Sequence, residues 1–276
     1  NEADFRRKTR EISEERTCMG KIIAVTNQKG GVGKTTTTIN MASALSSLGK
    51  RVLVLDTDAQ GNATLGLGVD KNDDAPGMFE LLLDECEASD CIKKLSYKKL
   101  WGTREFSIIP ASVDLAGLEA MVYDKKDKEY ILRDKIAPVL NDYDYILIDC
   151  PPSLSLMTIN GLAAADSVLI PVQCEYYALE GLAQLLETIN LVKEILNEKL
   201  AIEGIVFTMF DSRTNLSKQV IEDVRDNIDL PIFEQTIPRN IRLAEAPSYG
   251  EPIDIYDRLS SGARSYKKLA RELINK

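Results

Sequence analysis

Histidine is absent from the 276-residue chain. This absence excludes the usual catalytic triads and removes both the commonest general base and the commonest transition-metal ligand. Any chemistry must therefore depend on carboxylates, lysines, hydroxyl groups and a hard cation. The chain also lacks an apolar run of the roughly 18 residues that a membrane span requires, and its charged N-terminus does not resemble a secretory signal. We expect a cytoplasmic protein.

Cysteine is scarce, and its spacing matches no metal-binding or disulfide pattern. The five cysteines are odd in number and include no CxxC pair; they are Cys18, Cys86, Cys91, Cys150 and Cys174. Neither a disulfide framework nor a zinc site is indicated, so we expect reduced thiols.

The charge of the chain is negative overall but unevenly distributed. A net charge of −9 argues against a monomer that coats itself in nucleic acid, because phosphate contacts need clustered lysine and arginine. Between residues 239 and 276, however, eight basic and five acidic residues give a local charge of +3, so the rest of the chain carries −12. Composition alone fits either a local basic patch or a solvated helix face with scattered charge.

Two parts of the chain differ in composition. Residues 1–18 are dense in charge and nearly free of large apolar side chains, so we interpret them as a flexible extension outside the core. Residues 19–276 alternate short apolar segments with longer helical patterns, without internal repeats or low-complexity linkers. We expect strands at 21–27, 51–58, 106–111, 143–150, 167–172, 201–210 and 231–238, and helices at 35–49, 128–140, 179–197, 216–228 and 262–275. This alternation predicts a single α/β domain with a doubly wound, mostly parallel sheet covered by helices on both faces.

A glycine-rich turn, VTNQKGGVGKTTTT at 25–38, connects the first expected strand to the first expected helix. Backbone N–H groups and the positive end of a helix converge at such a turn, and they can hold a phosphate if no side chain blocks its approach. Gly30, Gly31 and Gly33 satisfy that condition. Lys34 would then meet the outer phosphates, and the hydroxyl group of Thr35 would bind Mg²⁺.

Two phosphate-binding patterns compete for this turn. The dinucleotide pattern GxGxxG would begin at Gly31 but has Thr36 in place of its third glycine, so it fails. The nucleoside-triphosphate pattern GxxxxGK[ST] has Gln28 at its first position, but its GK[ST] end is intact. The strand-turn-helix context and the acidic residues described next favour nucleotide binding over a chance glycine turn.

Three aspartates follow apolar strands. Asp56 and Asp58 end the segment RVLVLDTD, and Asp149 follows YILI. Parallel sheets bind ligands at the carboxyl ends of their strands, and a carboxylate there can hold magnesium. Aspartate also serves as a helix cap or turn former, an alternative that weighs most for Asp56.

Five ordered motifs resemble the ParA/Soj chromosome- and plasmid-partitioning ATPases of the deviant Walker A class. They are KGGVGKTT, DTDAQGNAT, ILIDCPPS, TMFDSRTNLS and IPRNIRLAEAPSYG. The resemblance runs from Met19 to the C-terminus, whereas the leader of residues 1–18 departs from the family pattern and Ala59 stands where the family often has proline. It implies a P-loop NTPase fold, ATP or ADP with Mg²⁺ as cofactors, and slow ATP hydrolysis.

The resemblance assigns separate roles to the two lysines of the loop. In this family the first lysine, here Lys29, reaches across a homodimer to the phosphates held by the other subunit, so that two chains enclose the ATP. Facing phosphate charges would repel one another without interleaved cations, which makes dimerisation conditional on the triphosphate. Lys34 would hold the subunit's own nucleotide, Asp58 would position the attacking water, and Asp149 would hold Mg²⁺ through water. Lys29, Lys34 and Asp58 are the implied catalytic residues.

The resemblance also implies three larger sets of residues. The nucleotide-binding set is Lys29, Gly30, Gly31, Val32, Gly33, Lys34, Thr35, Thr36, Met209, Pro238, Arg239 and Asn240. The metal-binding set is Thr35, Asp58 and Asp149. A third set, Asp56, Gln60 and Gly61, would support a switch segment that runs to Thr64.

The family also implies macromolecular partners. Its members bind double-stranded DNA without sequence preference as ATP dimers, and they work with a ParB-like protein on the nucleoid. Our candidates for contacts to DNA phosphates are Arg213, Arg239, Arg242, Arg264, Lys267 and Lys268. Dimerisation would double a modest patch, so the affinity should depend strongly on salt. Each arginine could instead pair with a nearby carboxylate.

Other functions compete with this interpretation. A MinD-like membrane-cycling ATPase would need a terminal amphipathic helix, but core packing explains the apolar stripe of the last expected helix more simply; the stripe is Tyr266, Leu269, Ala270, Leu273 and Ile274. A nitrogenase-reductase-like electron carrier would need cluster cysteines, whereas Cys150 and Cys174 fit buried packing better. A metabolic ligase or amide-forming synthetase would need a pocket for a small carboxylate. A regulatory scaffold would bind ATP without hydrolysing it, which Asp58 argues against.

Overall fold

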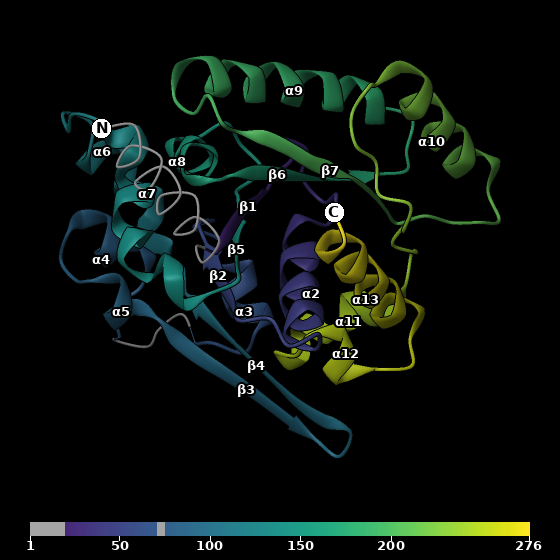
Figure 1. Ribbon diagram of the computed structural model, residues 1–276, viewed down its shortest axis with the longest axis horizontal. Coiled ribbons are helices and arrows are strands. Elements are labelled where there is room, and N and C mark those ends of the chain that lie inside the picture. The colour runs from purple at the N-terminus through teal and green to yellow at the C-terminus, as the bar shows by residue number, and fades with distance from the viewer. Residues whose placement is uncertain (1–19, 71–74) are drawn as a thin grey trace, which may run out of the picture.

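The computed structural model describes residues 20–70 and 75–276, and the expected extension at 1–18 lies outside them. Seven strands form one sheet in the order β3-β4-β2-β5-β1-β6-β7 (Figure 1). The strands are β1 (Lys21–Val25), β2 (Val52–Asp56), β3 (Lys93–Lys99), β4 (Gly102–Ile109), β5 (Tyr145–Asp149), β6 (Ser167–Gln173) and β7 (Ala201–Thr208). All pairings are parallel except that of β3 with β4, which confirms the expected mostly parallel sheet.

Helices cover both faces of the sheet because the central strands are apolar on both sides. In β1, Ile22 and Ala24 join one hydrophobic core, whereas Ile23 and Val25 join the other. The first core contains side chains from α4 (Met78–Leu83), α7 (Ile131–Ile136), α8 (Leu156–Ala164), α9 (Ala178–Ile195) and α10 (Asn215–Asn227). The second contains side chains from α2 (Lys34–Ser46), α3 (Asn62–Gly66), α11 (Ile241–Glu245), α12 (Ile253–Tyr256) and α13 (Ser261–Ile274).

The remaining helical segments are short. They are α5 (Ala88–Cys91), α6 (Leu118–Met121), η1 (Val113–Gly117), η2 (Lys128–Tyr130), η3 (Ala137–Asp142) and η4 (Ala246–Tyr249). The expected helix at 128–140 is therefore divided into η2, α7 and η3. The other four expected helices correspond to α2, α9, α10 and α13.

The expected strand at 231–238 is wrong. This segment makes only isolated bridges, Ile205 with Ile232 and Phe210 with Pro238. Between them, the backbone N–H groups of Glu234 and Gln235 donate to the carboxylate of Glu272 on α13, at 2.8 and 3.2 Å. Because a side chain takes these donors, no continuous ladder forms along β7.

The strand β3 was not expected from the sequence. Its sequence, KKLSYKK, is rich in lysine and alternates half-buried with exposed positions at one end of the strand order. It forms an antiparallel hairpin with β4, with Leu100 and Trp101 at the turn. The central strands are continuously apolar. The edge strand β3 is rich in lysine, so it lacks the apolar pattern by which the other strands were recognised.

The C-terminal helix α13 packs into the core. Tyr266, Leu269, Ala270 and Leu273 are buried, and Ile274 is half-buried against the same cluster. The hydroxyl group of Tyr266 lies 3.2 Å from that of Thr37 on α2, and the two helices lie side by side. Core packing therefore accounts for the apolar stripe. Across the described ranges 20–70 and 75–276, no helix has the length and apolar character needed to span a bilayer.

The buried and exposed faces of α9 give a matched test of how this helix packs against the first hydrophobic core. Leu185 is 1% exposed in the core, whereas Leu191 on the same helix is 54% exposed. Leu185→Ala should lower the free energy of unfolding by about 2 to 5 kcal/mol, because it leaves a cavity. Leu191→Ala should change it by less than about 0.5 kcal/mol. Urea unfolding measures both values, and equal losses would contradict the burial of this face.

Candidate functional site

The glycine-rich turn lies between the end of β1 and the start of α2. Gly31 and Gly33 have φ values of +76° and +91°, a left-handed backbone that favours glycine. Gly33 also occupies the N-cap position of α2, where no side chain caps the helix. A Cβ atom added at Gly30 or Gly31 would meet nothing within 4 Å. The loop therefore leaves open space at an uncapped helix N-terminus, where a phosphate can bind backbone N–H groups.

The two lysines of the loop occupy different positions. Lys34 is buried, and its Nζ donates to the carbonyl oxygen of Lys29 at 3.1 Å, so the side chain folds back over the loop. Burial lowers the pKa of Lys34, although the nearby carboxylate of Asp149 opposes this shift. The side chain of Lys29 is 38% exposed, forms an ion pair with Glu175, and lies 5.8 Å from the ring of Tyr177. The ammonium group of Lys29 therefore pairs with Glu175, whereas the ammonium group of Lys34 bonds to the loop backbone.

Asp149 is a fully buried carboxylate at the end of β5. It accepts hydrogen bonds from the hydroxyl groups of Thr35 at 2.8 Å and Thr38 at 3.0 Å. Burial, and secondarily the negative charge of Asp56, raise the pKa of Asp149 to about 8. A nearby cation would favour its ionised form.

These oxygen atoms fit a magnesium ion. Mg²⁺ prefers hard oxygen ligands, and it is usually held by one or two carboxylates, by water and by the phosphates of the substrate. Thr35 and Asp149 supply a hydroxyl group and a carboxylate beside the phosphate-binding turn. Within residues 20–70 and 75–276 there is no cluster of three or more acidic or cysteine side chains that could enclose a metal alone.

Asp56 anchors the segment that follows β2. This carboxylate is fully buried and accepts hydrogen bonds from the N–H of Asp58 at 3.2 Å and from the N–H and hydroxyl group of Thr64 at 2.8 and 2.7 Å. Burial raises its pKa to about 6. The hydroxyl group of Thr64 in turn accepts from the N–H of Ala111 at 2.9 Å. These bonds tie both ends of residues 58–64 to one side chain.

Asp58 and its neighbours lie nearer the surface. Asp58 is half-buried and accepts a hydrogen bond from the N–H of Gln60 at 2.9 Å. Gly61, with φ of +57°, is the N-cap residue of α3. Asp58 lines a cleft of about 540 Å³ over the loop, together with Gly30, Gly31, Gly33, Lys34, Thr35, Thr36, Ile39, Asn62, Leu65, Gly66, Pro152, Met209, Pro247 and Ser248. The candidate for positioning water thus shares a cleft with the candidate phosphate-binding residues.

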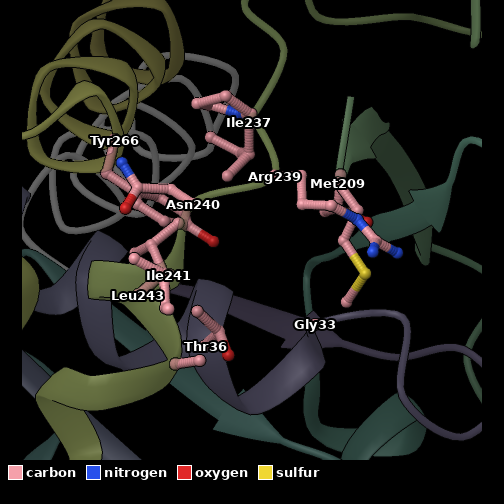
Figure 2. Close-up of a pocket in the computed structure, with 12 residues that line it drawn as sticks. Gly33, Thr36, Met209, Ile237, Arg239, Asn240, Ile241, Leu243 and Tyr266 are labelled. Atoms are coloured by element: carbon pink, nitrogen blue, oxygen red, sulfur yellow. The ribbon is translucent and has the colours of Figure 1, made fainter. Parts of the chain in front are cut away.

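An apolar cavity of about 380 Å³ adjoins this cleft, since both are lined by Gly33, Thr36 and Met209. Pro238, Arg239 and Asn240 also line the cavity, so it brings together six residues of the expected nucleotide-binding set: Gly33, Thr36, Met209, Pro238, Arg239 and Asn240 (Figure 2). The other lining residues were not expected from the sequence; they are Thr208, Ile237, Ile241, Leu243, Ala244 and Tyr266. The hydroxyl group of Thr208 donates to the carbonyl of Val32 at 2.7 Å and joins the end of β7 to the loop.

The candidate DNA-binding residues differ in the groups that they contact. Arg213 pairs with Asp211 at 2.7 Å, and Arg242 pairs with Glu245 at 2.9 Å. Arg239 lines the apolar cavity instead. Arg264 and Lys267 line a separate cavity of about 240 Å³ with Arg104, Arg258 and Tyr266, and Lys268 is exposed on the same helix. Tyr266 therefore lies against both cavities.

Comparisons with known proteins agree with this geometry. Residues 20–202 match the family model described as an AAA domain. The chain is 52% identical over 255 residues to the sporulation initiation inhibitor protein Soj of Bacillus subtilis, covering 92% of this chain and 98% of Soj. The chain belongs to the ParA/Soj family. It is also 49% identical to the chromosome partitioning protein ParA of Myxococcus xanthus, over 94% of this chain and 89% of that protein.

The fold is similarly shared with solved structures. A Mycobacterium smegmatis protein described as cobyrinic acid a,c-diamide synthase, with bound ATP analog and magnesium, is 39% identical and has a TM-score of 0.81. The match covers 93% of this chain and 94% of that chain. The family and the P-loop fold expected from the motifs are confirmed, whereas the roles of individual site residues stay predictions.

The raised pKa of Asp149 predicts how pH affects the stability of the nucleotide-free protein. The pKa lies at about 8 in the folded chain, against an ordinary value of 3.8. Between these values the folded protein binds more protons than the unfolded chain, so the free energy of unfolding should fall as the pH rises. Urea unfolding of the nucleotide-free protein between pH 4 and 8 measures the slope.

Asp149→Asn isolates this contribution. The variant should lose most of the slope between pH 6, near the pKa of Asp56, and pH 8, and it should be more stable than the parent at pH 8. A variant that keeps the full slope in that interval would show that the proton binds elsewhere.

Proposed function

We propose that this protein is a magnesium-dependent ATPase that dimerises on ATP and binds DNA without sequence preference in that state. Slow hydrolysis, stimulated by a ParB-like partner, then releases the DNA, and this cycle segregates a chromosome, plasmid or mobile element. The observation that carries the proposal is the pair of lysines in one phosphate-binding turn. Lys34 bonds to the backbone of the subunit's own loop, whereas Lys29 is half-exposed and pairs with Glu175.

The residues of the site divide the work of hydrolysis. The loop N–H groups and Lys34 bind the phosphates, while the apolar cavity takes the base. Thr35 and Asp149 hold Mg²⁺, which neutralises phosphate charge when bound. Asp58 orients the attacking water in the shared cleft. With no histidine available as a base, the rate depends on positioning and charge stabilisation, so basal turnover is slow.

Dimerisation requires a change at Lys29. Its ammonium group pairs with Glu175 of the same chain. To reach phosphates in a second subunit, the side chain must leave this carboxylate. Triphosphate charge in the partner subunit provides the compensating attraction, which couples the dimer to ATP.

DNA binding follows from doubling a modest set of cations. Arg264, Lys267 and Arg258 face one cavity, near the exposed Lys268. Arg104 lines the same cavity but pairs with Asp254 at 2.7 Å. Two such sets in a dimer neutralise twice as many phosphates, which favours the ATP form and makes the affinity fall steeply with salt. Arg213 and Arg242 would first have to leave Asp211 and Glu245.

An amide-forming synthetase is the second candidate. It is supported by the similarity to the M. smegmatis protein. Curated relatives of the partitioning type are more similar in sequence, at 52% and 49% identity. ATP turnover that rises with DNA and a ParB-like protein would support partitioning. Turnover that requires a small carboxylic acid and ammonia would support the synthetase.

Sedimentation with DNA tests the proposed cycle. With ATP and Mg²⁺ the protein should co-sediment with DNA at low salt, and it should be released by ADP or by raised salt.

Lys34→Ala should lose nucleotide binding, because no other described cation covers the loop. Lys29→Ala should keep nucleotide binding but lose the dimer and the DNA. Asp58→Ala should form a DNA-bound dimer that persists, because hydrolysis is impaired.

Two results would overturn parts of this scheme. Equal DNA retention with ADP and ATP would remove the nucleotide switch. A normal ATP-dependent dimer of Lys29→Ala, measured by analytical ultracentrifugation, would remove the role of Lys29 across the interface.

The ion pair between Lys29 and Glu175 gives a separate prediction. Glu175→Gln should lower the ATP concentration at half-maximal dimerisation, because Lys29 is released at less cost. A partly exposed pair contributes at most about 1 kcal/mol, so the shift should not exceed about fivefold. Glu180→Gln, on the exposed first turn of α9, is the matched control and should cause no shift. Weaker dimerisation of Glu175→Gln would instead indicate that Glu175 positions Lys29 for the partner subunit.

A further inference from the structure

Two cysteine side chains meet outside the nucleotide site. Cys86 lies in the turn between α4 and α5, and Cys91 is the last residue of α5. Their sulfur atoms are 2.9 Å apart. Cys91 is buried, and its thiol is 3.5 Å from the carbonyl oxygen of Glu87, whereas Cys86 is partly accessible. The thiol of Cys86 is therefore accessible to a reagent, and the buried thiol of Cys91 lies in contact with it.

We propose that Cys86 and Cys91 form a redox-active dithiol that closes to an intramolecular disulfide by exchange with a low-molecular-weight disulfide. In the first step the Cys86 thiolate attacks one sulfur of the reagent, which breaks the reagent's S–S bond and expels one thiol. In the second step the Cys91 sulfur attacks the Cys86 sulfur and expels the other thiol. The two cysteines lose two electrons and two protons, and one reagent disulfide becomes two thiols.

The order of attack follows from burial. A thiolate must be accessible to reach a reagent, which favours Cys86. Burial raises the pKa of Cys91, and the carboxylates of Glu80 and Asp90 raise it further. Cys91 is therefore a poor nucleophile toward anything in solution. Toward Cys86 it acts at contact distance, where correct placement is equivalent to a very high local concentration.

The other cysteines provide internal comparisons. Cys150 and Cys174 are buried, and among the described residues neither thiol has a hydrogen bond to another cysteine like that between Cys86 and Cys91. Burial also raises the pKa of Cys174 to about 12, which keeps its thiol protonated. Neither has a partner with which to close. Cys18 lies outside the described residues, so it is replaced by serine in the test protein.

Native exchange followed by mass spectrometry tests this assignment. The full chain carrying Cys18→Ser is incubated with cystamine, a cationic disulfide that the acidic surroundings of the pair should attract. We expect the intact mass to fall by two hydrogen atoms, with no adduct. Peptide mapping should find Cys86 linked to Cys91. Addition of dithiothreitol should restore both thiols.

Single substitutions separate the two roles. With Cys91→Ser, Cys86 has no resolving partner, so it should accumulate the mixed disulfide with cysteamine. With Cys86→Ser, the buried Cys91 should stay reduced in the folded protein. Cys174→Ser is the matched control for a buried cysteine and should close its disulfide at the parent rate.

Two results would overturn the proposal. The first is a stable adduct on Cys86 when Cys91 is present. The second is a folded protein that keeps both thiols under conditions that modify every cysteine in urea. Both are read from the parent protein, so the test holds even if Cys91→Ser fails to fold.

Discussion

The buried carboxylate of Asp149 is the point on which the site depends. It lies at the end of a central strand, is fully enclosed, and holds the first turn of α2 through the hydroxyl groups of Thr35 and Thr38. This contact fixes the helix N-terminus relative to the strand ends, and thereby fixes the glycine-rich turn between them. Burying a carboxylate so completely is unfavourable in the nucleotide-free protein, as its raised pKa indicates. Under the proposed function, a cation bound with the nucleotide would relieve that cost.

Parallel topology brings the other groups to the same place. β1, β2, β5 and β7 all end at this edge, and they carry the loop, Asp56, Asp149 and Thr208. Asp56 holds the segment that bears Asp58, while Thr208 bonds to the loop carbonyl of Val32. No single element builds the cleft. Strands from distant parts of the chain each supply one polar group, which is characteristic of doubly wound sheets.

Most of the central sheet could be predicted, because continuous apolar runs leave few alternatives to buried parallel strands. The positions of the loop and its aspartates were also predictable, since the carboxyl ends of parallel strands meet at one edge of the sheet. The polar edge strand β3 was not, because its lysines resemble a surface loop. The segment at 231–238 looked like a strand, but the N–H groups of Glu234 and Gln235 bond to the side chain of Glu272. The same limit applies to the ion pair of Lys29 and Glu175 and to the meeting of Cys86 and Cys91, since neither has a sequence pattern.

Tyr266 lines both the apolar cavity beside the phosphate-binding loop and the cavity that Arg264 and Lys267 line. Its ring lies against the cavity assigned to the base and also against the cavity bordered by Arg264 and Lys267, and its hydroxyl group contacts Thr37 beside the phosphate-binding turn. The helix α13 thus lines the apolar cavity proposed for the base and carries part of the proposed DNA surface. Thermodynamic reciprocity then sets a condition on the proposed cycle. The factor by which ATP raises the affinity for DNA must equal the factor by which DNA raises the affinity for ATP. Under the proposed function, DNA would therefore raise the protein's affinity for ATP, in addition to being bound by the ATP form.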